Sequence, residues 1–226
     1  MIDSKMFSSE VEESFKWLTD LDFQFRQLDT NIVFERIKSD EAFAIGFSWS
    51  EYNRIHLYGL TAYKRFNSIE NIIHVATEKP VDYTIKHHWK GDVPDELERI
   101  SDQSHPATNS FFLENKSQVE VFSDMVKNFL HHEANDFFEQ FETIHDVLKW
   151  LKAHEVKQHA ELLVQNNNTG MLRKLILMKE GHCEDFEDLF QRYVGFLKEK
   201  YATKESPYSE MYEVFSKLDD YFIHPD

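Results

Sequence analysis

The longest run of regularly spaced apolar residues lies in the middle of the chain. Apolar side chains recur there at every third or fourth position, which predicts an amphipathic helix with one buried face. The residues of this stripe are Val119, Phe122, Met125, Val126, Phe129 and Leu130. We expect a capping box of Ser117 and Glu120 to start the helix, and Asn135-Asp136 to bend or break it.

Helical spacing continues from there to the end of the chain. Thr143 is a candidate cap for a helix that carries Ile144, Val147, Leu148 and Leu151. Further amphipathic patterns cover about residues 155–165, 169–180, 183–201 and 208–222. The second half of the chain is therefore predicted to be all-helical.

The first half opens with one helix and then changes period. Ser9 and Glu12 form a candidate capping box for a helix that ends near Thr19-Asp20. Apolar and polar residues then alternate, which predicts strands at about 23–28, 32–37, 42–49, 52–60 and 81–89, with a short helix from Ser68 between the last two. In the third strand large residues lie on one face and small residues on the other, so we expect something to lie close over the small face.

These patterns predict an α+β fold. An N-terminal helix and an antiparallel meander sheet of four to five strands come first, because short turns join consecutive strands. The helical half follows a linker at 91–109 that contains Pro94 and Pro106. We expect an α+β sheet domain at 1–106 and a helical domain at 107–226, either separate or packed as one unit.

The chain is strongly acidic, with 25 Lys and Arg against 41 Asp and Glu and a formal net charge of −16. Residues 1–106 hold 12 basic and 19 acidic side chains, and the remainder holds 13 and 22, so both halves share the charge. Such a surface repels phosphate backbones, which argues against nucleic acid as a partner. It serves either to keep the protein in solution or to steer a basic protein partner towards it.

Cysteine and hydropathy point to a compartment. The single cysteine, Cys183, excludes an intramolecular disulfide and favours a reducing environment. No apolar run reaches the ~20 residues that cross a bilayer, and the first residues lack the features of a secretory signal. We expect a cytoplasmic protein with no membrane partner; its oligomeric state stays open.

Two local patterns resemble reactive sites. His132-Glu133 followed by Asp136 resembles a zincin helix motif whose second histidine is replaced, so we expect no metal site. Cys183 beside His182 could be a nucleophile, but Glu184 and Asp185 would raise the pKa of its thiol. Six glycines without the needed spacing exclude phosphate-loop and dinucleotide fingerprints, so no cofactor is expected.

One strand face combines polar groups that could bind a ligand. Arg54, His56 and Tyr58 share a face of the fourth predicted strand, and His87 in the fifth could join them. These residues would line a pocket, or they would form the solvent-exposed face that antiparallel sheets commonly have.

The opening of the chain resembles a group of bacterial families. A helix with Phe15 and Trp17-Leu18 leads through Leu21-Asp22-Phe23 into Ile32–Arg36 and the third strand. Further along the chain, Asp136–Phe141 is a phenylalanine-rich segment. Uncharacterised bacterial domain families, which include predicted immunity proteins of polymorphic toxin systems, show similar features. The resemblance covers about residues 10–60 and 120–150 and implies a binding role.

The function expected from these observations is non-enzymatic binding of a protein partner, in one form neutralisation of a basic toxin by an immunity-type protein. An enzyme or small-molecule binder that uses the His/Tyr/Arg strand face is the first alternative. A structural module for protein–protein interaction is the second.

Overall fold

The computed structural model describes residues 3–51, 53–100, 110–166, 169–202, 208–218 and 221–222. The chain divides into two compact units that are discontinuous in sequence. The first unit combines Met1–Lys64 with Lys86–Gln140, and the second combines Arg65–Ile85 with Phe141–Asp226. The domain boundary expected between residues 106 and 107 lies outside the described residues, so it stays a prediction.

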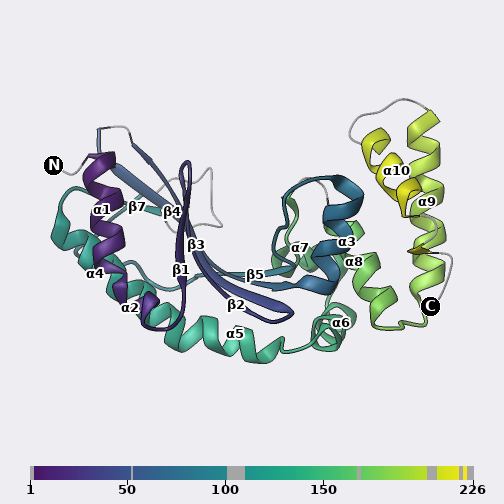
Figure 1. Ribbon diagram of the computed structural model, residues 1–226, viewed down its shortest axis with the longest axis horizontal. Coiled ribbons are helices and arrows are strands. Elements are labelled where there is room, and N and C mark those ends of the chain that lie inside the picture. The colour runs from purple at the N-terminus through teal and green to yellow at the C-terminus, as the bar shows by residue number, and fades with distance from the viewer. Residues whose placement is uncertain are drawn as a thin grey trace. The chain divides into compact units, whose positions relative to one another are not determined.

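An antiparallel sheet forms the centre of the first unit (Figure 1). Its strands run in the order β1-β2-β3-β4-β7-β6, with β5 also paired to β4. Their bounds are β1 Gln24–Leu28, β2 Asn31–Lys38, β3 Glu41–Glu51, β4 Ile55–Phe66, β5 Ile85–His88, β6 Glu98–Arg99 and β7 Ser110–Leu113. The predicted α+β class with an N-terminal helix and a meander is confirmed. Two strands were not expected: β6 lies in the predicted linker and β7 begins the predicted helical half, because strands of two and four residues carry little alternation.

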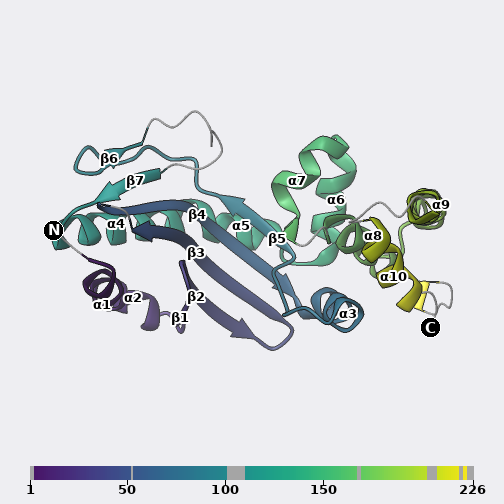
Figure 2. The ribbon, with the colours of Figure 1, turned by 90° about the horizontal axis from the view of Figure 1, so that it is seen from above.

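Helices cover one face of this sheet. They are α1 Ser4–Ser14, α2 Lys16–Thr19, α4 Lys116–Phe129, the π-helical turn η1 Leu130–Ala134 and α5 Asn135–Gln140. In Figure 2 the strand β4 crosses in front of α4 and α5. The core between the two layers is aromatic: Phe15 stacks on Phe34 with ring centroids 5.1 Å apart, and Phe47 meets Phe122 edge-on at 4.8 Å.

Two predicted helix starts are wrong by a few residues. The first helix begins at Ser4, because the Asp3 side chain accepts a hydrogen bond from the Met6 amide, and Ser9 lies inside it. The central helix begins at Lys116 behind Asn115, whose side chain accepts from the Gln118 amide, so Ser117 is not its cap. Asn135 does not break this helix, which continues through the π-turn into α5.

Strand β3 has the two faces expected from its sequence. Phe43, Ile45, Phe47 and Trp49 are buried on the face towards the helices, and Ala42 and Ala44 are buried on the other. A Cβ atom built on Gly46 would lie 3.2 Å from the Tyr63 ring and 3.5 Å from a Val33 methyl group. Large side chains of the neighbouring strands β2 and β4 therefore lie over the small residues.

Gly59 changes the phase of β4. Its φ of +74° is in the left-handed region, where glycine carries no steric cost. Before it, the buried apolar positions are Ile55 and Leu57; after it, they are Leu60 and Ala62, and Lys64 is buried in the same register, while Thr61 is buried on the opposite face beside His88. One residue with this backbone thus moves the inward-facing positions from odd to even numbers, as a bulge does.

The second unit is helical. Its elements are α3 Asn67–Thr77, α6 Ile144–Ala153, the 3-10 turn η2 Val156–Gln158, α7 His159–Leu162, α8 Gly170–Glu180, α9 Phe186–Ala202 and α10 Tyr208–Lys217. The predicted cap of α6 is confirmed, since Thr143 and Asp146 form a reciprocal capping box. None of the helices that the structure describes combines the length and the apolar character that crossing a bilayer requires.

Candidate functional site

Three of the four candidate strand-face residues lie together where β4 begins. The His56 ring centroid is 5.0 Å from that of Tyr58 and 5.6 Å from that of Phe112 on β7. The Arg54 guanidinium lies over the same Phe112 ring, 3.9 Å from its centroid. The pairing of His56 with Phe112 in the β4–β7 register places these groups side by side.

The charge of Arg54 is already matched by two carboxylates. Its Nη1 donates to Glu98 Oε2 at 2.5 Å and to Glu114 Oε1 at 3.0 Å. The hydrogen bond with Glu98, and then the one with Glu114, raises the pKa of Arg54 above its ordinary value, so the guanidinium stays charged. Arg54 therefore joins β4 to β6 and β7, and its guanidinium is not available to bind an anionic ligand.

His87 does not join this group. Its Nε2 lies 3.3 Å from Glu133 Oε2, and its ring stacks with Phe129 and Phe137 of the helical layer. Neighbouring residues of a strand face opposite sides, so His88 is the histidine of β5 on the side away from the helices. His88 contacts Thr61 of β4 there.

The hydrogen bonds of Thr61 fix the tautomer of His88. Thr61 Oγ1 donates to the Gly59 carbonyl oxygen at 2.7 Å and also lies 2.7 Å from His88 Nδ1. Because the hydroxyl has one hydrogen, Nδ1 carries the ring hydrogen and donates to Oγ1, which leaves Nε2 as the basic nitrogen. Burial, followed by the charges of Lys86, His87 and Lys90, lowers the pKa of His88 to about 4, so the ring is neutral at pH 7.

Exposed carboxylates surround Arg54 at this end of the first unit. Gln118 holds two segments together there: its side chain accepts from the Glu114 amide at 2.7 Å and donates to the Glu96 carbonyl oxygen at 2.9 Å. Lys116 extends the group to the N-terminal helix through an ion pair of 2.8 Å with Glu10. The hydrogen bond with Glu10 raises the pKa of Lys116, and the nearby charges of Glu120 and Glu13 add to this effect.

We call this surface the acidic corner. It comprises Glu10, Glu13, Glu96, Glu98, Glu114 and Glu120. Ion pairs join Lys16 to Glu13, Arg54 to Glu98 and Glu114, and Lys116 to Glu10. Glu98 and Glu114 keep 61% and 50% of their side-chain surface exposed, so both carboxylates remain open to solvent although they pair with Arg54. No local sequence pattern predicts the acidic corner, because its members come from segments that only the fold brings together.

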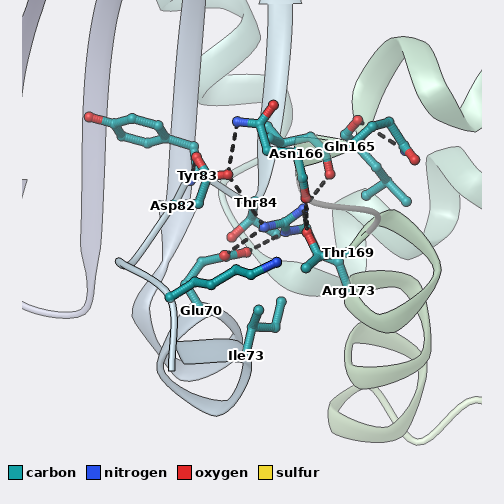
Figure 3. A network of polar contacts seen from close by, with 12 residues as sticks. Glu70, Ile73, Asp82, Tyr83, Thr84, Gln165, Asn166, Thr169 and Arg173 are labelled. Atoms are coloured by element: carbon teal, nitrogen blue, oxygen red, sulfur yellow. Dashed lines mark hydrogen bonds and ion pairs between the residues drawn. The ribbon is translucent and has the colours of Figure 1, made fainter. Parts of the chain in front are cut away.

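A second polar cluster is buried in the second unit (Figure 3). Arg173 of α8 is fully buried and holds Glu70 of α3 through two parallel hydrogen bonds, Nε to Oε1 at 2.6 Å and Nη2 to Oε2 at 2.8 Å. Its Nη1 donates to the Val164 carbonyl oxygen and to Thr169 Oγ1. The carboxylate of Asp82 lies 3.9 Å from Nη2.

This cluster is structural. Every nitrogen of the guanidinium faces an acceptor, and the bidentate pair with Glu70 is the geometry in which a buried charge is best compensated. Asn166 extends the cluster by donating to Asp82 at 2.9 Å. Arg173 thus joins α3, the segment before α8 and α8 itself, and it offers no open group to a ligand.

The two reactive patterns of the sequence have structural explanations. His131 and His132 are exposed on the π-turn. Among the residues that the structure describes, no three histidine, cysteine or acidic side chains are placed to hold a metal ion. Burial, and to a lesser extent Asp185, raises the pKa of the Cys183 thiol, which makes it a poor nucleophile at neutral pH.

Comparison with protein-family models, with curated proteins and with solved structures finds no significant match to this chain.

Proposed function

We propose that this protein is a non-enzymatic binding protein that holds a basic protein partner at the acidic corner. The observation that carries the proposal is the arrangement around Arg54, where hydrogen bonds of Arg54 to Glu98 and Glu114, and of Gln118 to the Glu114 amide, hold exposed carboxylates at the β6 edge of the sheet. Preorganised charge of one sign favours specific encounter with a partner of the other sign.

The distribution of charge supports the same proposal. The segments of the first unit hold 12 basic and 22 acidic residues, a balance of −10, and those of the second hold 13 and 19, a balance of −6. The unit with the acidic corner is the more acidic one. A long-range field of this kind raises the association rate with a basic partner and weakens as salt rises.

The form of the proposal that we favour is an immunity-type protein that neutralises a basic toxin in the cytoplasm. The single cysteine fits a reducing compartment. The ion pairs of Arg54 count against the alternative of a small anionic ligand at the strand face, because protein carboxylates already occupy its guanidinium.

The test is affinity capture followed by reconstitution. The wild-type chain and the variant with Glu96→Gln, Glu98→Gln and Glu120→Gln are used to capture proteins from the lysate of the native cell. We expect the wild type to capture a discrete basic protein that binds again after purification. Its dissociation constant should be at least about tenfold higher for the variant, which corresponds to a loss of about 1.4 kcal/mol in binding free energy.

The control variant removes three charges from the second unit through Glu184→Gln, Asp185→Asn and Glu187→Gln, which are all exposed. It makes the net charge less negative by the same three units as the first variant, and it should bind the partner within about twofold of the wild type. Equal weakening by both variants would mean that only net charge matters, and the acidic corner would not be the binding site.

A further inference from the structure

Strand β1 is an edge of the sheet. In the part of the chain that the structure describes, it pairs with β2 on one side, and the strand order begins with it. Four of its five residues are exposed, and Leu28 is 64% exposed. Sheet edges are usually protected by charged side chains, especially lysine, by proline or by a bulge. Gln24–Leu28 contains no lysine or proline, and its one charged residue is Arg26.

The directions of the backbone groups along β1 follow from the neighbouring strands. The Trp49 amide donates to the Thr30 carbonyl oxygen, so the backbone groups of Asn31 point away from β3 and towards its partner Leu28. The register then directs the groups of Leu28, Arg26 and Gln24 towards β2. The N–H and C=O groups of Phe25 and Gln27 point outward from the sheet edge.

Acidic residues flank this edge. Asp20 and Asp22 are exposed before β1, and Asp29 is exposed directly after it. Within the strand, the charge of Arg26 is matched by Glu35 of β2, with Nη1 and Oε2 3.1 Å apart. A strand laid along the edge would therefore meet outward backbone groups in the middle and negative charge at both ends.

We propose that β1 accepts an extended segment of the protein partner as an additional strand, and that this segment carries Lys or Arg on both sides of its paired residues. The mode is β-augmentation, in which backbone hydrogen bonds supply affinity and flanking side chains supply specificity. The inference rests on the proposed function, since it names how a basic partner would be held. It adds a second contact surface to the acidic corner.

The test uses a synthetic probe and the whole protein labelled with ¹⁵N. The probe is an acetylated and amidated peptide of alternating valine and threonine with two lysines at each end. On titration we expect amide shifts at Phe25, Gln27 and the flanking Asp22 and Asp29, and none with the same peptide carrying glutamate in place of lysine. A probe with N-methylated backbone amides should lose at least about tenfold in affinity, because it cannot complete the ladder.

Gln27→Pro removes one outward N–H and leaves the β1–β2 ladder intact, since proline is tolerated on the solvent side of edge strands. We expect it to abolish the shifts, whereas Gln27→Ala, which keeps the N–H, should retain them. If Gln27→Pro does not fold, the N-methylated probe still decides the question. Equal binding by Gln27→Pro, or by the N-methylated probe, would overturn the proposal.

The location of the shifts separates this inference from the proposed function. Shifts at Glu96, Glu98 and Glu114 without shifts in β1 would overturn the edge proposal and leave the acidic corner standing. No shift at either place up to millimolar probe would count against both. Concentration-dependent shifts of β1 without any probe would identify a second copy of the chain as the occupant and overturn the assignment to a basic segment.

Discussion

Arg173 and Glu70 lie 103 positions apart in the sequence and form a fully buried bidentate ion pair. The pair fastens α3, which the chain inserts between two strands of the sheet, to α8 of the C-terminal helices. It explains at residue level why Arg65–Ile85 belongs to the second unit although it lies between parts of the first.

Removing one partner of this pair should destabilise the second unit strongly. Arg173→Met leaves the Glu70 carboxylate buried without its cation, which costs about 3–5 kcal/mol. Amide hydrogen exchange in segments 67–77 and 170–180 should speed up accordingly, while β2 and β3 of the first unit serve as internal control. The double variant with Glu70→Leu should be more stable than Arg173→Met alone; a double variant that is worse would contradict this account of the pair.

Two glycine substitutions should act in opposite directions. A Cβ on Gly59 meets no atom within 4 Å, so Gly59→Ala costs only the strain of a φ of +74°, about 1–2 kcal/mol. Gly195 lies exposed inside α9, also without a neighbour within 4 Å, so Gly195→Ala should stabilise by about 0.5–1 kcal/mol. Denaturant unfolding of both variants measures the two changes in the free energy of unfolding. Changes of the same sign would show that the positive φ is not the reason for a glycine at position 59.

The stability of the first unit should depend on His88 in mildly acidic solution. Its folded pKa of about 4 lies below its ordinary value of 6.5, so the unfolded chain binds the proton more readily. The contribution is fully present above pH 6.5 and is lost as the pH falls from there towards 4. His88→Asn keeps a donor for Thr61 but does not titrate, and its stability should fall less over this range. If the free energy of unfolding depends on pH in the same way for the wild type and for His88→Asn, the titration of His88 does not contribute.

The capping box of α6 should contribute measurably to the stability of the second unit. Thr143 Oγ1 accepts from the Asp146 amide at 3.3 Å, and the Asp146 carboxylate accepts from the Thr143 amide at 2.8 Å. Thr143→Ala should cost about 1 kcal/mol, and Thr143→Ser, which keeps the oxygen, much less. Chemical denaturation monitored by circular dichroism compares the two; a similar loss for both would point to the methyl group instead of the cap.

Local patterns predicted the elements that depend on local physics. The alternation in β3 and the cap at Thr143 could be read from a few neighbouring residues, and both are confirmed. The predicted starts at Ser9 and Ser117 were wrong because Asp3 and Asn115 cap these helices earlier, by accepting from the amides of Met6 and Gln118. Several side chains near a helix start can act as caps, and only the backbone conformation selects one.

The site depended on information that no local pattern holds. Alternation placed His56 and Tyr58 on one face, but the register with β7 brought in Phe112, and β6 supplied Glu98. His87 lies apart from His56 and Tyr58, and His88 meets Thr61 instead, because the pairing of β5 with β4 is a tertiary contact.

The binding proposal is tested most directly by hydrogen exchange of the complex with the captured and purified basic partner. The account predicts protection of amides in segments 95–100 and 110–118 around the acidic corner, and loss of that protection in high salt. Protection confined to α9 and α10, with no change around Arg54, would contradict it.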